Sequence, residues 1–353
     1  MNDKVRDYIL NQVTEHPTDI TAIATKEFNV SRQTIVHYLN QLSDEGLVVG
    51  KGNTKARRYE LKNFVKKEFY QKVDKSVEED VLWREKILPL MDDLKPNVID
   101  ICQYGFTEIV RNVLDHSESK SFLYSITRNA ICVELDVFDH GIGIFNKIQR
   151  DFNLNDPRHA LLELAKGKLT SDPKGHTGEG IFFTSRMFDD FTIYSRPLFY
   201  SRESKDNSDW LLETGESDRK GTLVTMIIPP NSSRTTQSIF DAFSPDKETY
   251  GFSRTHVPIE LARYDREQLV SRSQARRLLA RFDRFSEVLL DFRDVNTIGQ
   301  AFADEIFRVY QLEHPATQIF AINTTNEVEK MIQRAQNRNE LKPDAPNEQK
   351  QLF

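Results

Sequence analysis

The feature that most constrains the fold is a polar stripe on one predicted helix. At 3.6 residues per turn, Glu108, Asn112 and His116 lie on one side of that helix, about 40° apart from one to the next. The stripe borders the apolar sector of the helix, whereas a solvated face would more often lie opposite it. We interpret the stripe as the edge of a cavity, with an ordinary solvent-exposed face as the alternative.

A glycine-containing segment follows a predicted buried strand. Asp139 comes directly after the apolar run 131–138 and is followed by Gly141 and Gly143. A carboxylate at a strand end can accept a hydrogen bond from an exocyclic amine such as that of adenine, and glycine allows the backbone to approach a planar ring. Ordinary turns use the same residues, so this segment predicts a site only together with the motifs around it.

A second glycine segment opens a predicted buried helix. Gly178 and Gly180 precede the apolar stretch 181–188. Free backbone N–H groups at the start of such a helix form a site for phosphates. Gly221 and Thr222 then begin another apolar strand. The motifs together predict a nucleotide pocket.

In this order the motifs resemble those of the GHKL (Bergerat-fold) ATPases, which include gyrase, mismatch-repair ATPases, heat-shock chaperones, histidine kinases and anti-sigma serine kinases. The resemblance spans residues 97–229 and rests on four ordered matches. It implies a Bergerat-type α/β sandwich that binds ATP and Mg²⁺. Oxygen ligands for Mg²⁺ and catalysis by positioning and charge neutralisation agree with that implication.

The resemblance also implies roles for individual residues. Asn112 would be the Mg²⁺ ligand, Glu108 the carboxylate that orients or activates a water or hydroxyl, and Asp139 the group that reads adenine. The implied glycines of the pocket and phosphate lid are Gly141, Gly143, Gly178 and Gly180, and Thr222 would support the adenine end.

The branch of the superfamily stays open at this point. His116 gives the pattern Glu-x3-Asn-x3-His, which is more similar to the anti-sigma serine kinases, whereas Gly178-Glu-Gly180 is also similar to the mismatch-repair ATPases. Water and a protein hydroxyl are therefore both candidate acceptors. We expect residues 144–177 to form a mobile lid. Its candidate phosphate contacts, each with a merely solvated side chain as the alternative, are Lys166, Lys168, Lys174 and His176.

Residues 1–62 predict three helices followed by two short strands. Val5, Ile9 and Val13 have helical spacing, a second helix follows Asp19, and Ser31 is a plausible N-cap for a third helix over 32–44. The strands of residues 45–61 flank a basic, glycine-containing loop. This arrangement resembles a winged helix-turn-helix of the common bacterial regulator type.

The winged-helix resemblance implies DNA contacts, with a protein-docking module as the alternative. The stretch 51–58 contains basic residues and no acid, which suits phosphate contacts. The candidate phosphate contacts are Lys51, Lys55, Arg57 and Arg58, and the candidate contacts to base edges are Arg32, Gln33, Thr34 and His37.

The next segment, residues 63–95, is predicted to form one or two amphipathic connector helices that transmit the nucleotide state or dimerise the DNA reader. Candidate packing residues in it include Phe64, Phe69 and Tyr70. With this connector, the expected regions are 1–62, 63–95, an ATP-binding domain over 96–230, a domain over 250–336, and a disordered tail over 337–353.

The region 250–336 alternates predicted strands and helices, which indicates a small α/β domain. The segment 291–308 resembles the STAS-like domains, relatives of the anti-sigma-factor antagonists. Their switch serine is replaced here by the turn at Gly299-Gln300-Ala301, and Thr297 is the nearest hydroxyl. We interpret the acidic side chains of this region as turn caps and as a solvated helix face; they are Asp291, Asp304 and Glu305.

Composition limits the remaining classes. The net charge is −6, no apolar run approaches the roughly 20 residues that span a bilayer, and the N-terminus lacks a signal-peptide core. We therefore expect a cytoplasmic protein without membrane contact. Cys102 and Cys132 fall in an apolar helix sector and a buried strand, so both are predicted to be core residues.

The sequence thus predicts a multidomain α+β protein with a winged helix, a Bergerat-type sandwich and a STAS-like domain. We expect a regulator that binds and hydrolyses ATP with Mg²⁺ and couples its nucleotide state to DNA binding or transcriptional control. A protein partner would bind the STAS-like domain, and a homodimer stays open. The alternatives are a serine/threonine protein kinase and a nucleotide sensor that docks proteins without binding DNA.

Overall fold

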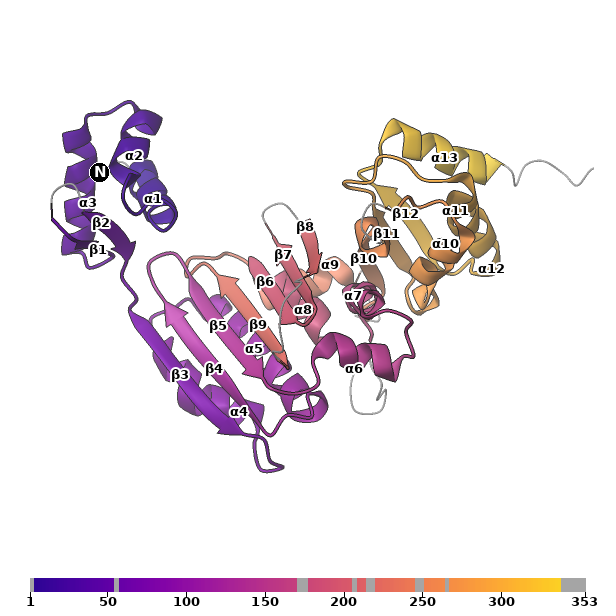
Figure 1. The fold of residues 1–353 in the computed structure, drawn as a ribbon, viewed down its shortest axis with the longest axis horizontal. Coiled ribbons are helices and arrows are strands. Elements are labelled where there is room, and N and C mark those ends of the chain that lie inside the picture. The colour runs from indigo at the N-terminus through magenta and orange to yellow at the C-terminus, as the bar shows by residue number, and fades with distance from the viewer. Residues whose placement is uncertain are drawn as a thin grey trace, which may run out of the picture. The chain divides into compact units, whose positions relative to one another are not determined.

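The computed structural model describes residues 3–53, 57–169, 177–204, 208–213, 220–244, 251–263 and 267–337. The chain forms two compact units (Figure 1). Unit 1 contains Met1–Lys147 and Phe183–Ile239, and unit 2 contains Ile148–Phe182 and Phe240–Phe353. The units are therefore not consecutive in sequence, because the residues between Lys147 and Phe183 belong to the same unit as the C-terminal part.

The first part of unit 1 has the expected three helices and two strands. They are α1 (Asp3–Gln12), α2 (Ile20–Phe28), α3 (Arg32–Asp44), β1 (Val48–Lys51) and β2 (Arg58–Leu61). Ser31 caps α3 by accepting a hydrogen bond from the backbone N–H of Thr34 at 3.1 Å. Ile9, Ile35 and Leu39 are fully buried in the core of this part.

The second part of unit 1 is a seven-stranded sheet. Its strands, in spatial order, are β3 (Val65–Lys72), β4 (Ser121–Arg128), β5 (Val133–Asp139), β9 (Thr222–Ile228), β6 (Asp190–Ser195), β7 (Leu198–Glu203) and β8 (Ser208–Glu213). Each neighbouring pair is antiparallel.

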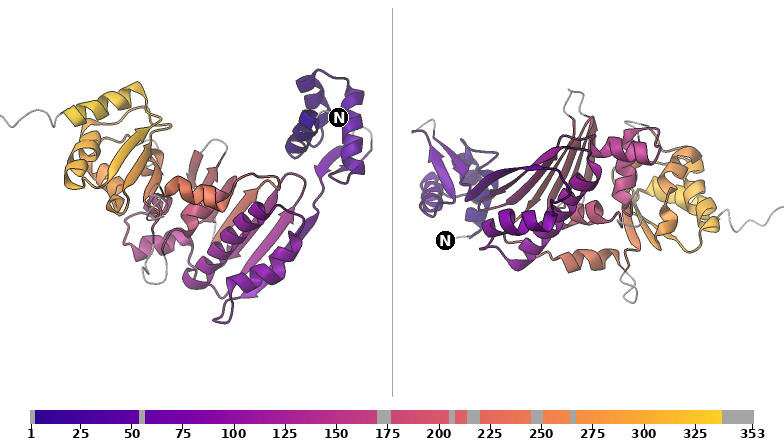
Figure 2. Two further views of the ribbon diagram at one scale, coloured as in Figure 1. Left: turned by 180° about the vertical axis from the view of Figure 1, so that it is seen from behind. Right: turned by 90° about the horizontal axis from the view of Figure 1, so that it is seen from below.

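Helix α5 (Pro96–His116) covers one face of this sheet (Figure 2). Phe106 of α5 contacts the ring of Tyr124 on β4 at 5.5 Å between centroids, edge to face. A Cβ on Gly105 would lie 2.4 Å from the Phe188 ring and 3.0 Å from Met226 Sδ, so the helix backbone approaches the sheet closely there. Burial alternates along β4, β5 and β9, which identifies the face under α5 as the core.

The predicted connector helix is wrong for residues 65–72, which form the edge strand β3. Phe69 pairs with Tyr124 in the β3–β4 register, and their rings stack with centroids 5.0 Å apart. Phe64 and Tyr70, expected to pack, are 47% and 62% exposed. Aromatic residues are common in half-buried strands as well as in amphipathic helices, so their presence does not decide between the two. Pairing with β4 therefore determines that residues 65–72 form a strand.

Short helices complete unit 1 and its junctions with unit 2. They are α4 (Glu79–Leu82), a π-helical turn at Trp83–Ile87, a 3₁₀ turn at Leu88–Leu90, α6 (Ile144–Asp151), α8 (Gly180–Met187) and α9 (Thr236–Phe243). The helical expectation for the region before α5 is thus met only from Glu79 onward. The predicted helix over 181–188 corresponds to α8.

Unit 2 is built around a three-stranded parallel sheet of order β10-β11-β12. Its strands and helices are α7 (Pro157–Lys166), β10 (Arg254–Pro258), η4 (Ile259–Ala262), α10 (Arg272–Leu279), η5 (Phe282–Arg284), β11 (Glu287–Asp291), α11 (Gln300–Asp304), η6 (Glu305–Tyr310), α12 (Gln311–Glu313), β12 (Gln318–Ile322) and α13 (Asn326–Asn337). The strands and helices predicted after residue 286 are all present. The predicted tail beyond Asn337 lies outside the described residues.

The predicted solvated acidic face in this unit is wrong. Asp304 and Glu305 are 3% and 5% exposed. Arg308 bonds Asp304 at 2.6 Å, and Arg276 of α10 bonds Glu305 at 2.6 Å. Because α10 packs against η6, Arg276 of α10 and Arg308 of η6 itself replace water as partners of these carboxylates.

Within the described ranges, no helix is long and apolar enough to cross a membrane. Both cysteines are free: Cys102 is buried and Cys132 is half-buried. Burial raises the pKa of both thiols above the ordinary value, most strongly at Cys102. Cys102 is therefore the core residue that its position predicted, and Cys132 is only partly so.

Candidate functional site

Asp139 ends β5 directly opposite Thr222, the first residue of β9. Its side chain lies on the α5 face of the sheet, and the residue is 3% exposed. The backbone N–H of Gly141 donates to Asp139 Oδ1 at 2.7 Å. Burial raises the pKa of Asp139 to about 6, although hydrogen bonds from Gly141 and Thr222 act in the opposite direction. Asp139 is therefore a buried carboxyl whose charge is only partly compensated.

The loop after Asp139 lies tightly against the end of α5. The N–H of Ile142 donates to the Ser117 carbonyl at 2.9 Å. A Cβ on Gly141 would lie 1.8 Å from that same carbonyl oxygen, and a Cβ on Gly221 would lie 1.9 Å from the Asp139 carbonyl oxygen. Gly221 also has φ +103°, which L side chains rarely adopt. Glycine is required at both positions for the two strand ends and the helix end to meet.

Gly143 and Thr222 fix the far side of this loop. Thr222 Oγ1 accepts a hydrogen bond from the N–H of Ile144 at 3.0 Å. A Cβ on Gly143 would lie 2.7 Å from Ser195 Oγ, and Ser195 donates to the Gly221 carbonyl at 3.1 Å. No sequence motif predicted a role for Ser195. Its only signal is a serine at the end of an apolar strand, and the structure buries it completely.

The polar stripe lies on α5 within the same unit. Glu108, Asn112 and His116 are each half-buried. Glu108 Oε1 is 3.7 Å from the guanidinium of Arg111, whose main partner is Glu79. The Ser117 carbonyl at the C-terminal end of α5 accepts the hydrogen bond from Ile142, so the helix that carries the stripe is in contact with the Asp139 loop.

The two lid glycines belong to unit 2. The N–H of Leu169 donates to the Gly178 carbonyl at 3.1 Å. Gly178 has φ +71°, and a Cβ there would lie 2.5 Å from the Leu169 backbone. Gly180 is the first residue of α8. The structure thus groups the predicted glycines into two sets, with Gly141 and Gly143 in unit 1.

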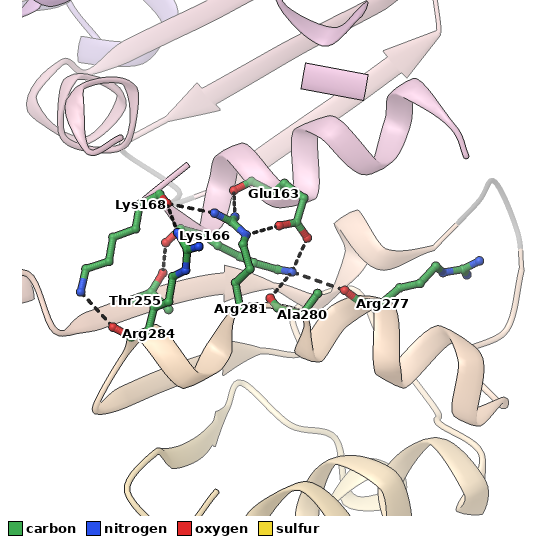
Figure 3. Close-up of polar contacts among 8 residues, drawn as sticks. All are labelled: Glu163, Lys166, Lys168, Thr255, Arg277, Ala280, Arg281 and Arg284. Carbon is green, nitrogen blue, oxygen red and sulfur yellow. Dashed lines mark hydrogen bonds and ion pairs between the residues drawn. The ribbon is translucent and has the colours of Figure 1, made fainter. Parts of the chain in front are cut away.

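Two of the four predicted lid contacts to phosphate have partners inside unit 2, and the prediction is wrong for the fully buried Lys166. Lys166 is completely buried, and its Nζ binds Glu163 Oε1 at 2.5 Å and the Ala280 carbonyl at 3.0 Å (Figure 3). Lys168 Nζ donates to the Arg284 carbonyl at 2.9 Å. Both side chains have their partners inside unit 2. The reason is that the apolar helix α7, which ends at Lys166, packs in that unit. Lys174 and His176 lie outside the described residues.

A groove of ≈ 300 Å³ lies on the opposite face of the sheet from Asp139. Leu123, Phe138 and Leu223 form its apolar walls. Asp136 lies in it and accepts hydrogen bonds from Ser125 at 2.9 Å and Thr225 at 2.6 Å. The sequence prediction missed this groove. The sequence signal for the groove is that apolar residues lie on both faces of β5 and β9 near one end of the strands. Strict alternation would place polar residues on one of these faces.

The candidate contacts to DNA bases are all accessible. Arg32, Gln33, Thr34 and His37 lie in the first turns of α3, and each is exposed. Thr34 also helps to cap the helix, since its hydroxyl is 2.9 Å from Ser31 Oγ.

Some of the candidate phosphate contacts of the stretch 51–58 already have partners within the protein. Glu60 pairs with Lys51 at 2.5 Å and with Arg58 at 3.1 Å. The Arg57 guanidinium lies 5.0 Å from the centroid of the Tyr59 ring. Lys55 lies outside the described residues. Glu60 therefore partly neutralises the strands that flank the basic loop.

Among the residues that the structure describes, no three His, Cys, Asp or Glu side chains are grouped to hold a metal ion. A Mg²⁺ ion that arrives with phosphates needs few protein ligands and keeps several waters. One amide oxygen, as at Asn112, fits that donor set.

Comparisons with known proteins address the C-terminal part of the chain. Residues 274–329 match a family described as a STAS-like domain of unknown function (DUF4325). No curated protein matches the chain. The match runs from within α10 through β11, α11 and β12 to the start of α13, and so includes two of the three strands of the parallel sheet. The chain therefore contains a STAS-like domain.

Proposed function

We propose that this protein is an ATP-binding regulator in which unit 1 binds Mg-ATP and residues 1–62 bind DNA as a winged helix. The proposed nucleotide domain is of the Bergerat type, with Asp139 reading the exocyclic amine of adenine. Thr222 and the glycine loop would shape the adenine end. Asn112 would contribute an oxygen ligand to Mg²⁺.

The observation that carries the proposal is the state of Asp139. The carboxyl is almost fully buried, and burial raises its pKa to about 6 despite the hydrogen bonds that favour its charge. A further donor, such as an exocyclic amine, would lower the free energy of the ionised form. The ionised Asp139 can accept a hydrogen bond from the exocyclic amine of adenine. The adenine ring is uncharged, so it does not repel the carboxylate.

Glu108 is the proposed acceptor of a proton from the attacking group. Bound Mg-ATP would supply a transferable γ-phosphate. Glu108 is half-buried on α5, its carboxylate lies 3.7 Å from the Arg111 guanidinium, and Arg111 also donates to Glu79 at 3.0 Å. Water as the attacking group makes the protein an ATPase, and a protein hydroxyl makes it a serine/threonine kinase.

DNA binding through residues 1–62 is the second half of the proposal. Three helices with an exposed polar start of α3, followed by a two-stranded hairpin, suit a recognition helix and a wing. The four exposed side chains on α3 support this interpretation. The pairing of Glu60 with Lys51 and Arg58 limits the charge that the wing offers to phosphates.

The decisive experiment measures ATP binding by calorimetry for the wild type, Asp139→Asn and Asp136→Asn. Asp136 lies on the same strand as Asp139 but faces the other side of the sheet, so Asp136→Asn is a matched control. We expect Asp139→Asn to weaken ATP binding at least about tenfold, because an uncharged amide replaces the ionised acceptor. Equal affinities for wild type and Asp139→Asn would refute the proposed site.

A further inference from the structure

The face of the seven-stranded sheet opposite α5 carries a row of apolar and aromatic side chains. The strand registers align one residue from each of six neighbouring strands: Tyr70, Leu123, Phe138, Leu223, Tyr194 and Phe199. Along their strands these residues occupy the less buried positions, and Tyr70 is 62% exposed. Because successive side chains of a strand point to opposite faces, this apolar row lies on the face away from α5 (Figure 2).

Acidic side chains lie along one side of the apolar row. Glu68 and Asp136 precede the row members of β3 and β5 by two residues and therefore share their face. Glu134 lies two residues further along β5. Burial and the nearby Asp136 raise the pKa of Glu134, although Lys66 acts in the opposite direction. Negative charge therefore gathers on this side of the row.

Basic side chains lie along the other side of the apolar row. Lys72 follows the row member of β3 by two residues, and His140 follows Phe138 by two. The His140 and Phe138 rings lie 4.5 Å apart between centroids, which places His140 beside the row. Lys220 lines the groove before β9. Strands β3 and β5 thus each present an acid, an aromatic ring and a base in succession on this face.

The groove of ≈ 300 Å³ lies over the middle of the apolar row, where Leu123, Phe138 and Leu223 form its walls. Side chains of a second sheet can fill such a groove, because sheets pack face to face about 10 Å apart with interdigitated side chains. Seven strands about 4.8 Å apart and about 20 Å long give a face of roughly 600 Å² in projection. Each partner of a standard interface buries about 800 Å², so the face is large enough for a stable pair.

The charges on the two sides of the row are complementary to those of a second copy. A rotation of 180° about the apolar row places the acidic side of one copy over the basic side of the other. It also keeps each strand over its own counterpart, so Glu68 faces Lys72 of the second copy and Asp136 faces its His140. Rotation about the strand direction would instead bring like charges together.

We propose that this face is the interface of a homodimer, with the two-fold axis along the apolar row. The interface is isologous, because each copy offers the same row and the same two sides. Burial of the row removes apolar surface from water, and the flanking charges fix the orientation of the two sheets. Dimerisation of this kind does not depend on nucleotide binding, so it can fail while the proposed function stands.

Sedimentation velocity of the full-length chain, from about 1 to 100 µM, tests the proposal. We expect a dimer whose Kd rises at least about tenfold in Glu68→Lys and in Lys72→Glu, because each reversal sets two pairs of like charges face to face. The double variant Glu68→Lys with Lys72→Glu should recover the wild-type Kd. An equimolar mixture of the two single variants should also form dimers, because opposite charges meet again.

Lys67→Glu is the matched control. It makes the same charge change at an exposed position of the same strand, but Lys67 pairs with the buried Ile126 and so belongs to the α5 face. We expect its Kd to match the wild type. Circular dichroism verifies that each variant is folded, and the variants replace exposed side chains.

Tyr70→Asp tests the apolar row separately from its flanks, and we expect it to raise Kd at least about tenfold. A monomeric wild type over the whole concentration range would overturn the proposal and leave the groove to a different occupant. A dimer that tolerates Tyr70→Asp and both charge reversals would place the interface elsewhere. Failure of the double variant and of the mixture to restore the dimer would overturn the proposed axis.

Discussion

Lys166 and Arg281 share the single carboxylate of Glu163 in unit 2, where Lys166 is fully buried and Arg281 is half-buried. Two positive charges and one negative charge leave an excess of positive charge, which backbone carbonyls and an aromatic ring partly offset. Lys166 Nζ lies 5.4 Å from the centroid of the Phe282 ring. This imbalance has a measurable consequence for stability.

We predict that the free energy of unfolding rises with pH between about 8 and 10.5 because of Lys166. Burial lowers its pKa to about 8 from an ordinary 10.5. In that window the unfolded chain binds the proton that the folded chain has lost, so higher pH favours folding; below pH 8 both states are charged and the penalty stays constant. The upper bound is about 3 to 4 kcal/mol, since one pKa unit is about 1.4 kcal/mol.

Urea unfolding of the wild type and Lys166→Met at pH 7.5 and 9.5 measures this effect. The methionine variant should lose the rise, and Lys330→Met should keep it. A rise of the same size in Lys166→Met would place its origin in another group.

ATP affinity should fall as the pH falls below about 6. The pKa of Asp139 is raised to about 6, mainly by burial, so the carboxyl gains a proton in that range and loses its ability to accept from an amine. Affinity should then weaken by up to about tenfold per pH unit. Calorimetric titrations between pH 5 and 7.5 test this, and Asp139→Asn should show weak binding without this transition. An affinity that is constant across pH 6 in the wild type would contradict the role of Asp139.

Glu108→Gln should separate binding from turnover. The amide keeps the shape of the side chain but cannot take a proton, so we expect ATP affinity to change little and turnover to fall about 10²- to 10⁴-fold. Steady-state hydrolysis and transfer of labelled phosphate to protein distinguish an ATPase from a kinase. Equal, negligible rates in wild type and variant would indicate a nucleotide sensor instead.

Glu60→Gln should strengthen DNA binding. The substitution releases Lys51 and Arg58 from their carboxylate partner and makes both available to phosphates. We expect tighter binding and a steeper dependence on salt concentration. Glu45→Gln is the control, because Glu45 pairs with Arg6 of α1 and not with a side chain of the hairpin. Weaker or unchanged binding after Glu60→Gln would argue against the hairpin as a DNA contact.

Local sequence signals predicted the elements that local physics decides. Ser31 is found as the cap of α3, and the strand ending at Asp139 and the helix beginning at Gly180 are where the apolar runs placed them. Glu108, Asn112 and His116 are half-buried on α5, as their position beside the apolar sector predicted.

Long-range pairing decided what the sequence prediction missed. Phe69 belongs to a strand because Tyr124 lies opposite it, a partner more than fifty positions away in sequence. Lys166 is buried because Glu163 and the carbonyl of Ala280 surround it, and a lysine near a glycine segment gives no sign of such partners. Sequence motifs therefore do not predict residues whose partners are distant in sequence. They do predict helix caps and elements with periodic apolar residues.

The place of α7 in unit 2 also bears on how this gene can be divided. A fragment ending near residue 240 would keep α7 but lose β10 and η4, against which the helix packs, and its leucines would meet water. A fragment that starts there would lack the helix that fills its own core. The parts of the chain before and after residue 240 therefore cannot be exchanged separately between proteins. We expect recombination to preserve function only when both parts are transferred together.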